Sequence, residues 1–445
     1  TVWHYIKTFN LPTKTFIQVN NNAYIYLKKV RVRNDPAGLN VMRYIYPKYD
    51  LSSFEQKLSW QKLFYMGSDS HLLGATTKER SEILQVKPNY SIKTQIFSNS
   101  SNISMMEKAS LSQDAISLVS NFSPLLSGNL YNSYIDYIEE SYPASLSYLY
   151  EIPGGMVRLP LSFYSSLLNP CPVHEYKGIE AGHIGCFTMK AGCWVNGIHF
   201  NSSDKKVILE YNESNKKNSI YDYFDYVVCT IPFSALRTIN IDPLFCNIKM
   251  RAIKEVNYTT AQKTLLLCKD RFWEKDGIIG GATYTDLPVS SLWYPSDHSV
   301  YLNNSPLNLN KLPYDKPGVM IGSYDFNLDA IRLTNLPEKR FHDEIKRQVE
   351  MVHGLPPGYL DNIVEEMKTV NWDQQPTFRG SLSFFTPQQK SIFSYGMAAP
   401  EYNERVFFAG EHISAVHRWI QGALHSGMVA ANSLAIACKK HIYNI

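Results

Sequence analysis

Several features that define large protein classes are missing from this 445-residue chain. No apolar run approaches the ~18 residues that a membrane-spanning helix needs, so we expect no membrane span. The seven cysteines are odd in number and form no C-x-x-C pair, which favours reduced thiols and a cytoplasmic protein. The net charge of +4 is too small to predict nucleic acid or a membrane surface as a partner.

The sequence also lacks the glycine-rich motif that is common in dinucleotide-binding proteins. The chain contains 23 glycines, and none of them forms the G-x-G-x-x-G turn that holds a dinucleotide pyrophosphate between a strand and a helix. What is present is the composition of an ordinary globular protein, with 44% hydrophobic and 19% charged residues. A chain of this length predicts two or three structural units with a large core.

The most informative segment lies near the C-terminus. Residues 406–409 are apolar on both faces and predict a short buried strand, after which Gly410 permits a tight exit that presents Glu411. The helix predicted next has one apolar stripe, formed by Ile420, Ala423, Leu424, Gly427, Ala431, Leu434 and Ala435. Gly422 and Gly427 would let another group approach this helix closely. Its N-terminus offers free N–H groups and partial positive charge to an anionic group. The alternative is an α/β crossover that only packs on a sheet.

The remaining patterns predict a mixed α/β protein. Helices are expected over 1–33, over most of 50–150, after the Gly154-Gly155 break, and over 338–353. Strands are expected at 194–200, 206–211, 225–232, 256–268, 318–324 and 366–372. The first two of these strands form a hairpin, because Asn201 to Asp204 between them are turn residues.

The C-terminal segment resembles the flavin-binding motif of the flavin-containing amine oxidases, most closely their L-amino-acid oxidase branch. Further segments at 151–160, 193–232 and 272–295 follow in the family's order, so the resemblance covers essentially the whole chain. It implies FAD as cofactor and an α/β fold: a Rossmann-like FAD-binding domain, incomplete at its N-terminus, a sheet-and-helix substrate domain and a helical subdomain. The expected limits are 1–33 for a substrate-domain segment, 34–150 for the helical subdomain, 151–258 and 373–445 for the FAD-binding domain, and 259–372 for the substrate domain.

The resemblance also implies roles for single residues. The matching lysine of the family, here Lys263, holds a water near the flavin and assists reoxidation by oxygen. The substrate-binding positions correspond to Tyr324, Trp372, Arg418 and Trp419. The cofactor-binding positions correspond to Val195, Trp372, Gly410, Glu411, Trp419, Ile420 and Ala423. Arg418 departs from the family, which has glycine before the helix tryptophan, and a histidine that some relatives use has no counterpart around Glu140.

Each of these residues also has a structural explanation. Lys263 could extend its stem from a strand edge to solvent, although burial among apolar neighbours would lower its pKa. Tyr324, Trp372 and Trp419 could be ordinary core aromatics. The loop at 170–192 contains Cys171, His174, His183 and Cys186, and Cys193 follows it. No pair of these has the spacing of a structural zinc site, so no metal is expected.

The implied activity is the conversion of an L-amino acid, oxygen and water into a 2-oxo acid, ammonia and hydrogen peroxide. The alternatives are a monoamine or polyamine oxidase, an amino-acid monooxygenase on the same scaffold, or a non-catalytic remnant without flavin. Relatives carry the glycine-rich turn and a carboxylate-binding arginine before the position that matches Thr1. We therefore expect a second chain, or an N-terminal segment of the same gene product, to supply them. A homo-oligomer is also expected.

Overall fold

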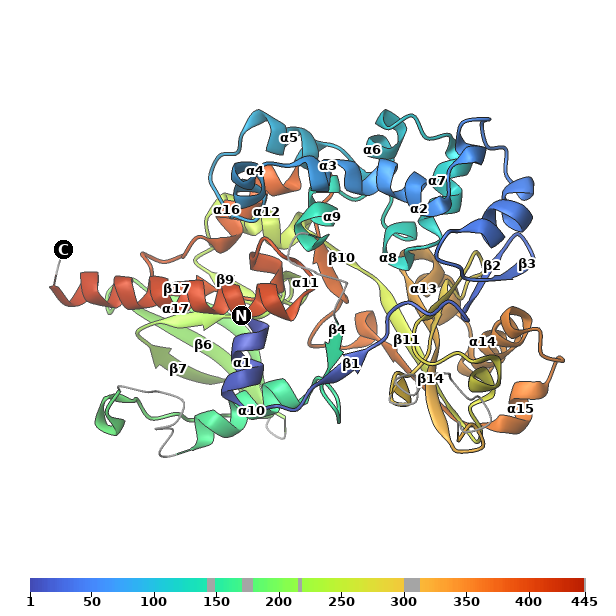
Figure 1. Cartoon of the computed structure of the whole chain (residues 1–445). Helices are drawn as coiled ribbons and strands as arrows, with labels where there is room; N and C mark the ends of the chain where they lie inside the picture. The colour runs from blue at the N-terminus through green and yellow to red at the C-terminus, as the bar shows by residue number, and fades with distance from the viewer. Residues whose placement is uncertain (142–148, 170–178, 215–217, 300–312, 444–445) are drawn as a thin grey trace. The chain divides into compact units, whose positions relative to one another are not determined.

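The computed structural model describes residues 1–141, 149–169, 179–214, 218–299 and 313–443. The chain divides into two compact units, whose elements can be followed in Figure 1. Unit 1 contains Thr1–Thr15, Tyr150–Glu255 and Phe393–Ile445, and unit 2 contains Phe16–Leu149 and Val256–Ile392. The segment 150–255 of unit 1 lies close to the expected limits 151–258. Two other segments group differently from the expected limits, since residues 1–15 belong to unit 1 and residues 373–392 to unit 2.

Unit 1 contains a four-stranded sheet of order β7-β6-β5-β9 and a parallel pair of order β17-β8. Its strands are β5 (Cys193–Asn201), β6 (Lys206–Glu213), β7 (Ile220–Phe224), β8 (Val227–Cys229), β9 (Asn240–Asp242) and β17 (Val406–Phe408). Its helices are α1 (Val2–Thr8), α10 (Arg158–Leu168), α11 (Phe233–Leu236), α12 (Asn247–Glu255) and α17 (Ile420–Tyr443), together with most of α16 (Gln389–Ala398). The predicted hairpin is confirmed as β5 and β6, and the strand ended by Pro232 is confirmed as β8.

The strand β17 and the helix α17 form the end of unit 1. All three residues of β17 are buried, as predicted, and β17 pairs in parallel with β8. The buried residues of α17 are Gly422, Ser426, Ala430 and Ala437. The predicted apolar stripe lies on α17 but is not its most buried face, since Ile420 is 42% exposed. Small side chains face the core here because the packing is close: a Cβ on Gly422 would lie 2.0 Å from the carbonyl oxygen of Val416.

Gly427 does not have the close neighbour that was expected. Apart from its chain neighbours and the nearby backbone of its own helix, no atom of the described chain lies within 4 Å of a Cβ built at this position. Gly422 alone confirms the prediction that glycine permits a close approach to α17.

Unit 2 is built on a seven-stranded sheet of order β15-β11-β14-β13-β12-β2-β3. Its strands are β2 (Tyr24–Leu27), β3 (Val30–Arg33), β11 (Ala261–Cys268), β12 (Ala282–Thr285), β13 (Ser291–Trp293), β14 (Gly318–Phe326) and β15 (Val364–Asn371). A separate pair is formed by β10 (Asn257–Thr259) and β16 (Leu382–Phe384). The helices α13 (Asn327–Thr334), α14 (Glu338–His353) and α15 (Tyr359–Ile363) accompany the sheet. Because α14 buries Phe341, Ile345, Val349 and Val352 on one stripe, its predicted span is confirmed.

The helix predicted over residues 1–33 is wrong beyond α1. The chain instead forms β1 (Lys14–Phe16), which pairs with β4 (Leu149–Glu151), and the hairpin of β2 and β3. Every residue of β2 is buried, because this strand lies between β12 and β3 inside the sheet. Lys28 and Lys29 form the turn with φ values of 51° and 62°. Two successive positive φ angles are typical of the type I′ turn, for which Asn-Gly is the usual sequence signal.

The helical region predicted between residues 50 and 150 is confirmed. It contains α2 (Trp60–Phe64), α3 (Ser70–Gly74), α4 (Thr77–Ile83), α5 (Ile92–Asn99), α6 (Asn102–Lys108), α7 (Gln113–Ser120), α8 (Pro124–Ser127) and α9 (Tyr134–Ser141). Serine or threonine side chains cap α2, α4, α5, α6 and α7 by accepting a backbone N–H of the first turn. Such caps stabilise helices that are too short to be stable by themselves.

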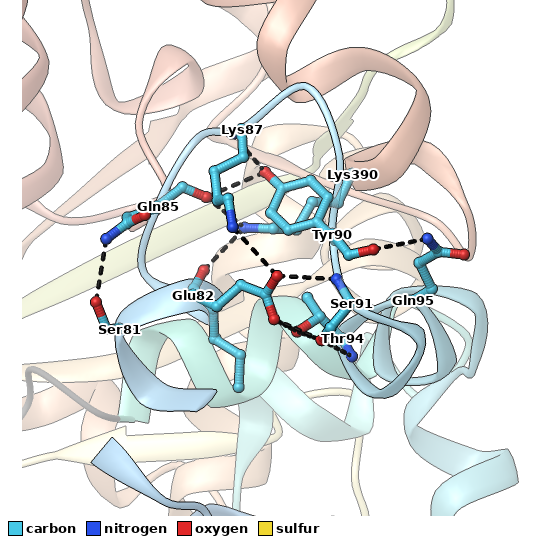
Figure 2. A network of polar contacts seen from close by, with 10 residues as sticks. Ser81, Glu82, Gln85, Lys87, Tyr90, Ser91, Thr94, Gln95 and Lys390 are labelled. Carbon is cyan, nitrogen blue, oxygen red and sulfur yellow. Dashed lines mark hydrogen bonds and ion pairs between the residues drawn. The ribbon is translucent and has the colours of Figure 1, made fainter. Parts of the chain in front are cut away.

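The loop between α4 and α5 is held by Glu82 (Figure 2). Its carboxylate accepts the backbone N–H of Ser91 and the hydroxyl of Thr94, each at 2.8 Å, and the ammonium of Lys87 at 3.2 Å. Burial alone would raise the pKa of Glu82, but the hydrogen bonds from Ser91, Thr94 and Lys87 lower it to about 2.

Lys390, at the start of α16, closes the same network from inside (Figure 2). Its ammonium is buried, forms an ion pair with Glu139 of α9, and donates to the carbonyl oxygen of Ile83 at 3.0 Å. It also lies 5.1 Å from the ring centre of Tyr90. Burial would lower the pKa of Lys390, but the Glu139 carboxylate raises it above its ordinary value. The ammonium therefore joins α4, α9 and α16.

Candidate functional site

In unit 1 the chain leaves β17 through a turn that only glycine permits. Gly410 has a φ of +138°, and a Cβ on it would lie 2.5 Å from the ring of His412. Its N–H donates to the hydroxyl of Ser426 on α17 at 2.9 Å, which joins the turn to the helix. Glu411 follows at the start of a short 3₁₀ turn, Glu411–Ile413, and is half-buried. The predicted strand, tight exit and presented carboxylate are thus all found.

Glu411 and Arg418 lie together. One carboxylate oxygen, Oε2 of Glu411, accepts the backbone N–H of Arg418 at 2.7 Å. Arg418 has a φ of +72°, in the left-handed region that favours glycine. Glycine adopts this backbone conformation without strain, which agrees with the glycine that the resemblance implies at this position. Here an arginine takes the same backbone conformation, and the carboxylate of Glu411 fixes it.

The start of α17 presents two large apolar side chains. Trp419 is 38% exposed and Ile420 is 42% exposed. The carbonyl oxygen of Trp419 accepts the N–H groups of Gly422 and Ala423, so the helix begins at this point. A planar ring with an electron-rich edge fits such a surface, because apolar contact and the partial positive charge of the helix start occur together. Val195 lies in the same unit, half-buried on β5 beside a bulge between Val195 and Gly197.

Lys249 and His412 are two buried basic residues beside the turn at Gly410, and the sequence pattern did not identify them. The ammonium of Lys249 on α12 donates to the carbonyl oxygens of Met397 at 2.6 Å and Ala399 at 2.7 Å. It lies 3.6 Å from the ring centre of Phe408 on β17. Burial lowers the pKa of Lys249 to about 7. The pKa of His412 falls to about 3 through burial, with His417 and Lys249 adding to the effect, so this ring is neutral.

In unit 2 Lys263 and Tyr324 lie together. They face each other in the antiparallel register of β11 and β14, and the ammonium of Lys263 is 4.2 Å from the ring centre of Tyr324. Burial lowers the pKa of Lys263. Burial also raises the pKa of Tyr324 to about 12, with a contribution from the charge of Glu140, so its phenol stays protonated and can donate. The arrangement combines a desolvated amine and a hydrogen-bond donor on one face of the sheet.

Trp372 directly follows β15, whose residue Val370 pairs with Lys263. Its ring is half-buried and packs edge-on against Phe378, with the ring centres 5.7 Å apart. Trp372 therefore lies at the same end of the sheet as Lys263 and Tyr324. The roles predicted for these residues remain predictions.

Among the residues that the structure describes, no group of three or more His, Cys, Asp or Glu side chains could hold a metal ion. Cys171 and His174, two of the candidates in the 170–192 loop, lie outside the described residues. None of the helices in the described ranges is both long enough and apolar enough to cross a membrane.

Comparisons with known proteins show the family of this chain. A family model described as flavin containing amine oxidoreductase matches residues 1–435. An L-amino-acid oxidase of Sistrurus catenatus edwardsii is 27% identical over 97% of this chain and 75% of its own length. One from Crotalus adamanteus is 26% identical with the same coverage, and one from Vipera ammodytes ammodytes is 27% identical over 97% of this chain and 79% of its length.

Solved structures show the same fold. Wild-type putrescine oxidase bound to putrescine superposes with a TM-score of 0.68, covering 98% of this chain and 85% of that chain. A variant of putrescine oxidase with one substitution gives the same TM-score and coverage. The sequence identity is 12% in both cases, so this likeness concerns the fold alone.

Proposed function

The chain belongs to the flavin-containing amine oxidoreductases, and on that premise we propose that it catalyses the FAD-dependent oxidative deamination of L-amino acids. The amine and the adjacent Cα–H of the substrate lose two electrons and two protons. The resulting imino acid takes up water and releases ammonia, which leaves the 2-oxo acid. Oxygen accepts the two electrons and two protons and becomes hydrogen peroxide.

Unit 1 supplies residues that fit the cofactor. FAD, when bound, provides the two-electron acceptor of the reaction. Gly410 and Glu411 would hold it at the end of β17, and the start of α17, with Trp419, Ile420 and Ala423, would meet its ring. The partial positive charge of the helix start would stabilise negative charge on that ring. Val195 of unit 1 and Trp372 of unit 2 are further proposed cofactor contacts. Arg418, together with Tyr324, Trp372 and Trp419, is proposed to contact the substrate.

The observation that carries the proposal is the placement of Lys263 over Tyr324. A tyrosine whose pKa is raised to about 12 keeps its proton and can donate a hydrogen bond to a substrate carboxylate. A desolvated lysine with a lowered pKa can hold a water molecule and respond to charge that develops during the reaction with oxygen. The phenol supports the choice of an amino acid over a simple amine, and the lysine supports a reaction with oxygen.

Three other functions use the same scaffold. A monoamine or polyamine oxidase would need no donor for a carboxylate. An amino-acid monooxygenase would use the same substrate but would incorporate oxygen into the product instead of releasing peroxide. A remnant without flavin would bind partners only. The amino-acid oxidase is favoured because Tyr324 offers a buried phenol where a substrate carboxylate needs a donor.

Peroxide release over a panel of L-amino acids, D-amino acids, monoamines and putrescine tests the proposal. We expect L-amino acids alone to give peroxide, ammonia and a 2-oxo acid. Tyr324→Phe should raise KM for the best amino acid by about 10-fold, the cost of roughly one hydrogen bond to a charged group. Tyr284→Phe, on β12 of the same sheet, is the matched control and should leave KM unchanged. Peroxide from amines alone would contradict the amino-acid assignment.

We also propose a partner chain. A second chain would provide a glycine-rich turn for the dinucleotide and an arginine for the substrate carboxylate. Assembly into a homo-oligomer and a cytoplasmic location are further parts of this proposal. The absence of the turn from the sequence supports the first part, and the cysteine pattern supports the location.

A further inference from the structure

A second polar cluster lies on the sheet face opposite Lys263 and Tyr324. Successive side chains of a strand point to opposite faces, so Gln262 and Asp325 point away from that pair. Gln262 and Asp325 face each other in the register of β11 and β14, and both are completely buried. A buried carboxylate is costly, so its surroundings need an explanation.

The hydrogen-bond donors to Asp325 within the described chain are neutral groups. Its Oδ1 accepts the backbone N–H of Ser290 at 2.6 Å and the hydroxyl of Ser290 at 2.9 Å. Its Oδ2 accepts the side-chain amide of Gln262 and the hydroxyl of Ser323. Burial raises the pKa of Asp325 to about 6, and the hydrogen bonds from Ser323, Ser290 and Gln262 limit the rise. The carboxylate therefore costs stability at neutral pH, which indicates a role other than stabilising the fold.

The cluster ties together four neighbouring strands at the level of Lys263. On one side, the hydroxyls of Ser290 and Ser291 donate to the backbone carbonyl of Tyr324 at 3.3 and 3.0 Å. On the other side, the hydroxyl of Thr264 donates to Gln262 at 3.0 Å and meets the hydroxyl of Thr369 on β15 at 2.9 Å. The strands β15, β11, β14 and β13 are consecutive in the sheet. Both backbone segments that carry the Lys263–Tyr324 pair are thus held from both sides.

The strand register is irregular near Lys263, so hydrogen bonds that hold the strands in place are needed in this part of the sheet. A bulge follows Thr264, and Gly322 is the extra residue on β14. A Cβ on Gly322 would lie 2.2 Å from a methyl group of Leu266, so the bulge depends on glycine. A slip of one residue at a bulge would turn Lys263 to the opposite face of the sheet.

We propose that Asp325, acting through Gln262 and Ser290, is a positioning residue that fixes the ammonium of Lys263 above the ring of Tyr324. The catalytic meaning of this pair rests on the proposed function. The positioning itself can be measured in the folded chain without any substrate or cofactor.

Asp325→Asn tests the proposal by a change of a single atom. The new side chain still offers Oδ1 to Ser290, but its NH₂ group faces the amide nitrogen of Gln262, so two donors meet and Gln262 must turn away. Competitive acetylation of lysines at a series of pH values, read by mass spectrometry, gives the pKa and reactivity of Lys263. We expect the pKa of Lys263 to rise toward its ordinary value, because the amine becomes solvated. Its labelling at pH 8 should become several-fold slower, because acetylation needs the neutral amine and a raised pKa leaves less of it.

Glu350→Gln is the matched control. Glu350 is also a buried carboxylate of unit 2, where it accepts the backbone N–H groups of Gly358 at 3.1 Å and Leu360 at 2.8 Å. This change should leave the labelling of Lys263 as in the parent. Unchanged labelling of Lys263 in folded Asp325→Asn would overturn the proposal. If Asp325→Asn does not fold, Ser290→Ala removes only one hydroxyl donor and must give a smaller change in the same direction.

A double-mutant cycle connects the positioning to the reaction. In flavin-loaded protein, Asp325→Asn should slow the reaction with oxygen in the parent but add little to Lys263→Met, because the two residues act as one unit. Independent, additive effects would overturn the link. If Lys263→Met itself leaves the oxygen reaction unchanged, the proposed role of Lys263 fails, while the labelling experiment still decides the positioning.

Discussion

At Arg418 the backbone adopts a conformation that favours glycine, while the side chain is that of an arginine. A left-handed conformation costs a non-glycine residue roughly 1–2 kcal/mol. The N–H of this residue donates to the Glu411 carboxylate, and a hydrogen bond to a charged group contributes about 1.5–3 kcal/mol. Glu411 therefore offsets the strain of the turn, besides the cofactor contact proposed for it.

Two substitutions separate these roles of Glu411. Glu411→Ala removes the acceptor and should lower both flavin occupancy and the free energy of unfolding, the latter by about 1–3 kcal/mol. Glu411→Gln keeps an acceptor for Arg418 and should lower flavin occupancy with a smaller loss of stability. Flavin absorbance per protein and urea unfolding measure the two effects. Full occupancy and a normal flavin spectrum in Glu411→Ala would show that Glu411 does not bind the cofactor.

Asp325 gives the protein a pH-dependent loss of stability. Its pKa is raised from 3.8 to about 6, so between these values the folded state binds more protons than the unfolded state. The stability due to protonated Asp325 is complete below about pH 4 and is lost as the pH rises through about 6. Relative to Asp325→Asn, the parent should lose on the order of 3 kcal/mol across this range. Urea unfolding at several pH values measures the difference, and a constant difference would contradict the assignment.

Residue by residue, the sequence predicted that Lys263 and Tyr324 lie in strands and that Glu411 follows a strand. Lys263, Tyr324 and Glu411 follow from the patterns around them, since apolar runs and glycines mark where each strand begins and ends. The bond from Arg418 to Glu411 and the cluster around Asp325 depend on register and on loop conformation. These are set by tertiary packing and leave no local pattern in the sequence.

Among the elements, those with a strong period were predicted closely. The helix α14 was found at its predicted limits, because its buried residues recur at helical spacing over sixteen residues. The hairpin β2–β3 was missed because β2 is buried on both faces and therefore shows no alternation. Its Lys28-Lys29 turn also lacks the glycine or asparagine that usually marks positive φ angles.

The ion pair of Lys390 and Glu139 should be one of the most sensitive contacts between helices. Lys390→Met leaves the Glu139 carboxylate buried with its countercharge removed, and we expect a loss of about 3–5 kcal/mol of unfolding free energy. The double variant Lys390→Met with Glu139→Leu should recover most of this loss, because no buried charge remains. Lys440→Met breaks the exposed pair with Glu404 and should cost less than about 1 kcal/mol. Equal losses from Lys390→Met and Lys440→Met in chemical denaturation would contradict this expectation.

At the scale of the whole molecule, the residues proposed for the cofactor and for the substrate belong mostly to different units. Gly410, Glu411 and Trp419 lie in unit 1, whereas Lys263 and Tyr324 lie in unit 2. The resemblance to a family predicted a division of the chain, and the expected segment 151–258 lies close to the segment 150–255 of unit 1. The crossings at residues 15/16 and 392/393 were not expected, because they fall inside the elements β1 and α16.

A prediction for the whole molecule concerns how much FAD the 445-residue chain binds without another polypeptide. The sequence contains no G-x-G-x-x-G turn, and in the described part of unit 1 the strand β17 has β8 as its strand neighbour. We therefore expect these 445 residues alone to bind FAD weakly, and a polypeptide with a dinucleotide-binding turn to raise the occupancy. Native mass spectrometry together with flavin absorbance measures both. Stoichiometric FAD and amino-acid oxidation by this chain alone would contradict the expectation.

The interleaving of the two units has a consequence for synthesis on the ribosome. The strand β8 ends at Cys229, but its partner β17 begins only at Val406, after the long second segment of unit 2 has been made. During that interval β8 lacks the strand with which it pairs in the native structure. Unpaired strand edges can form hydrogen bonds with wrong strands. Because of this order of segments, unit 1 can complete its folding only after its last segment has been synthesised. We therefore expect unit 1 to depend on chaperones more than unit 2 does while the chain is being made.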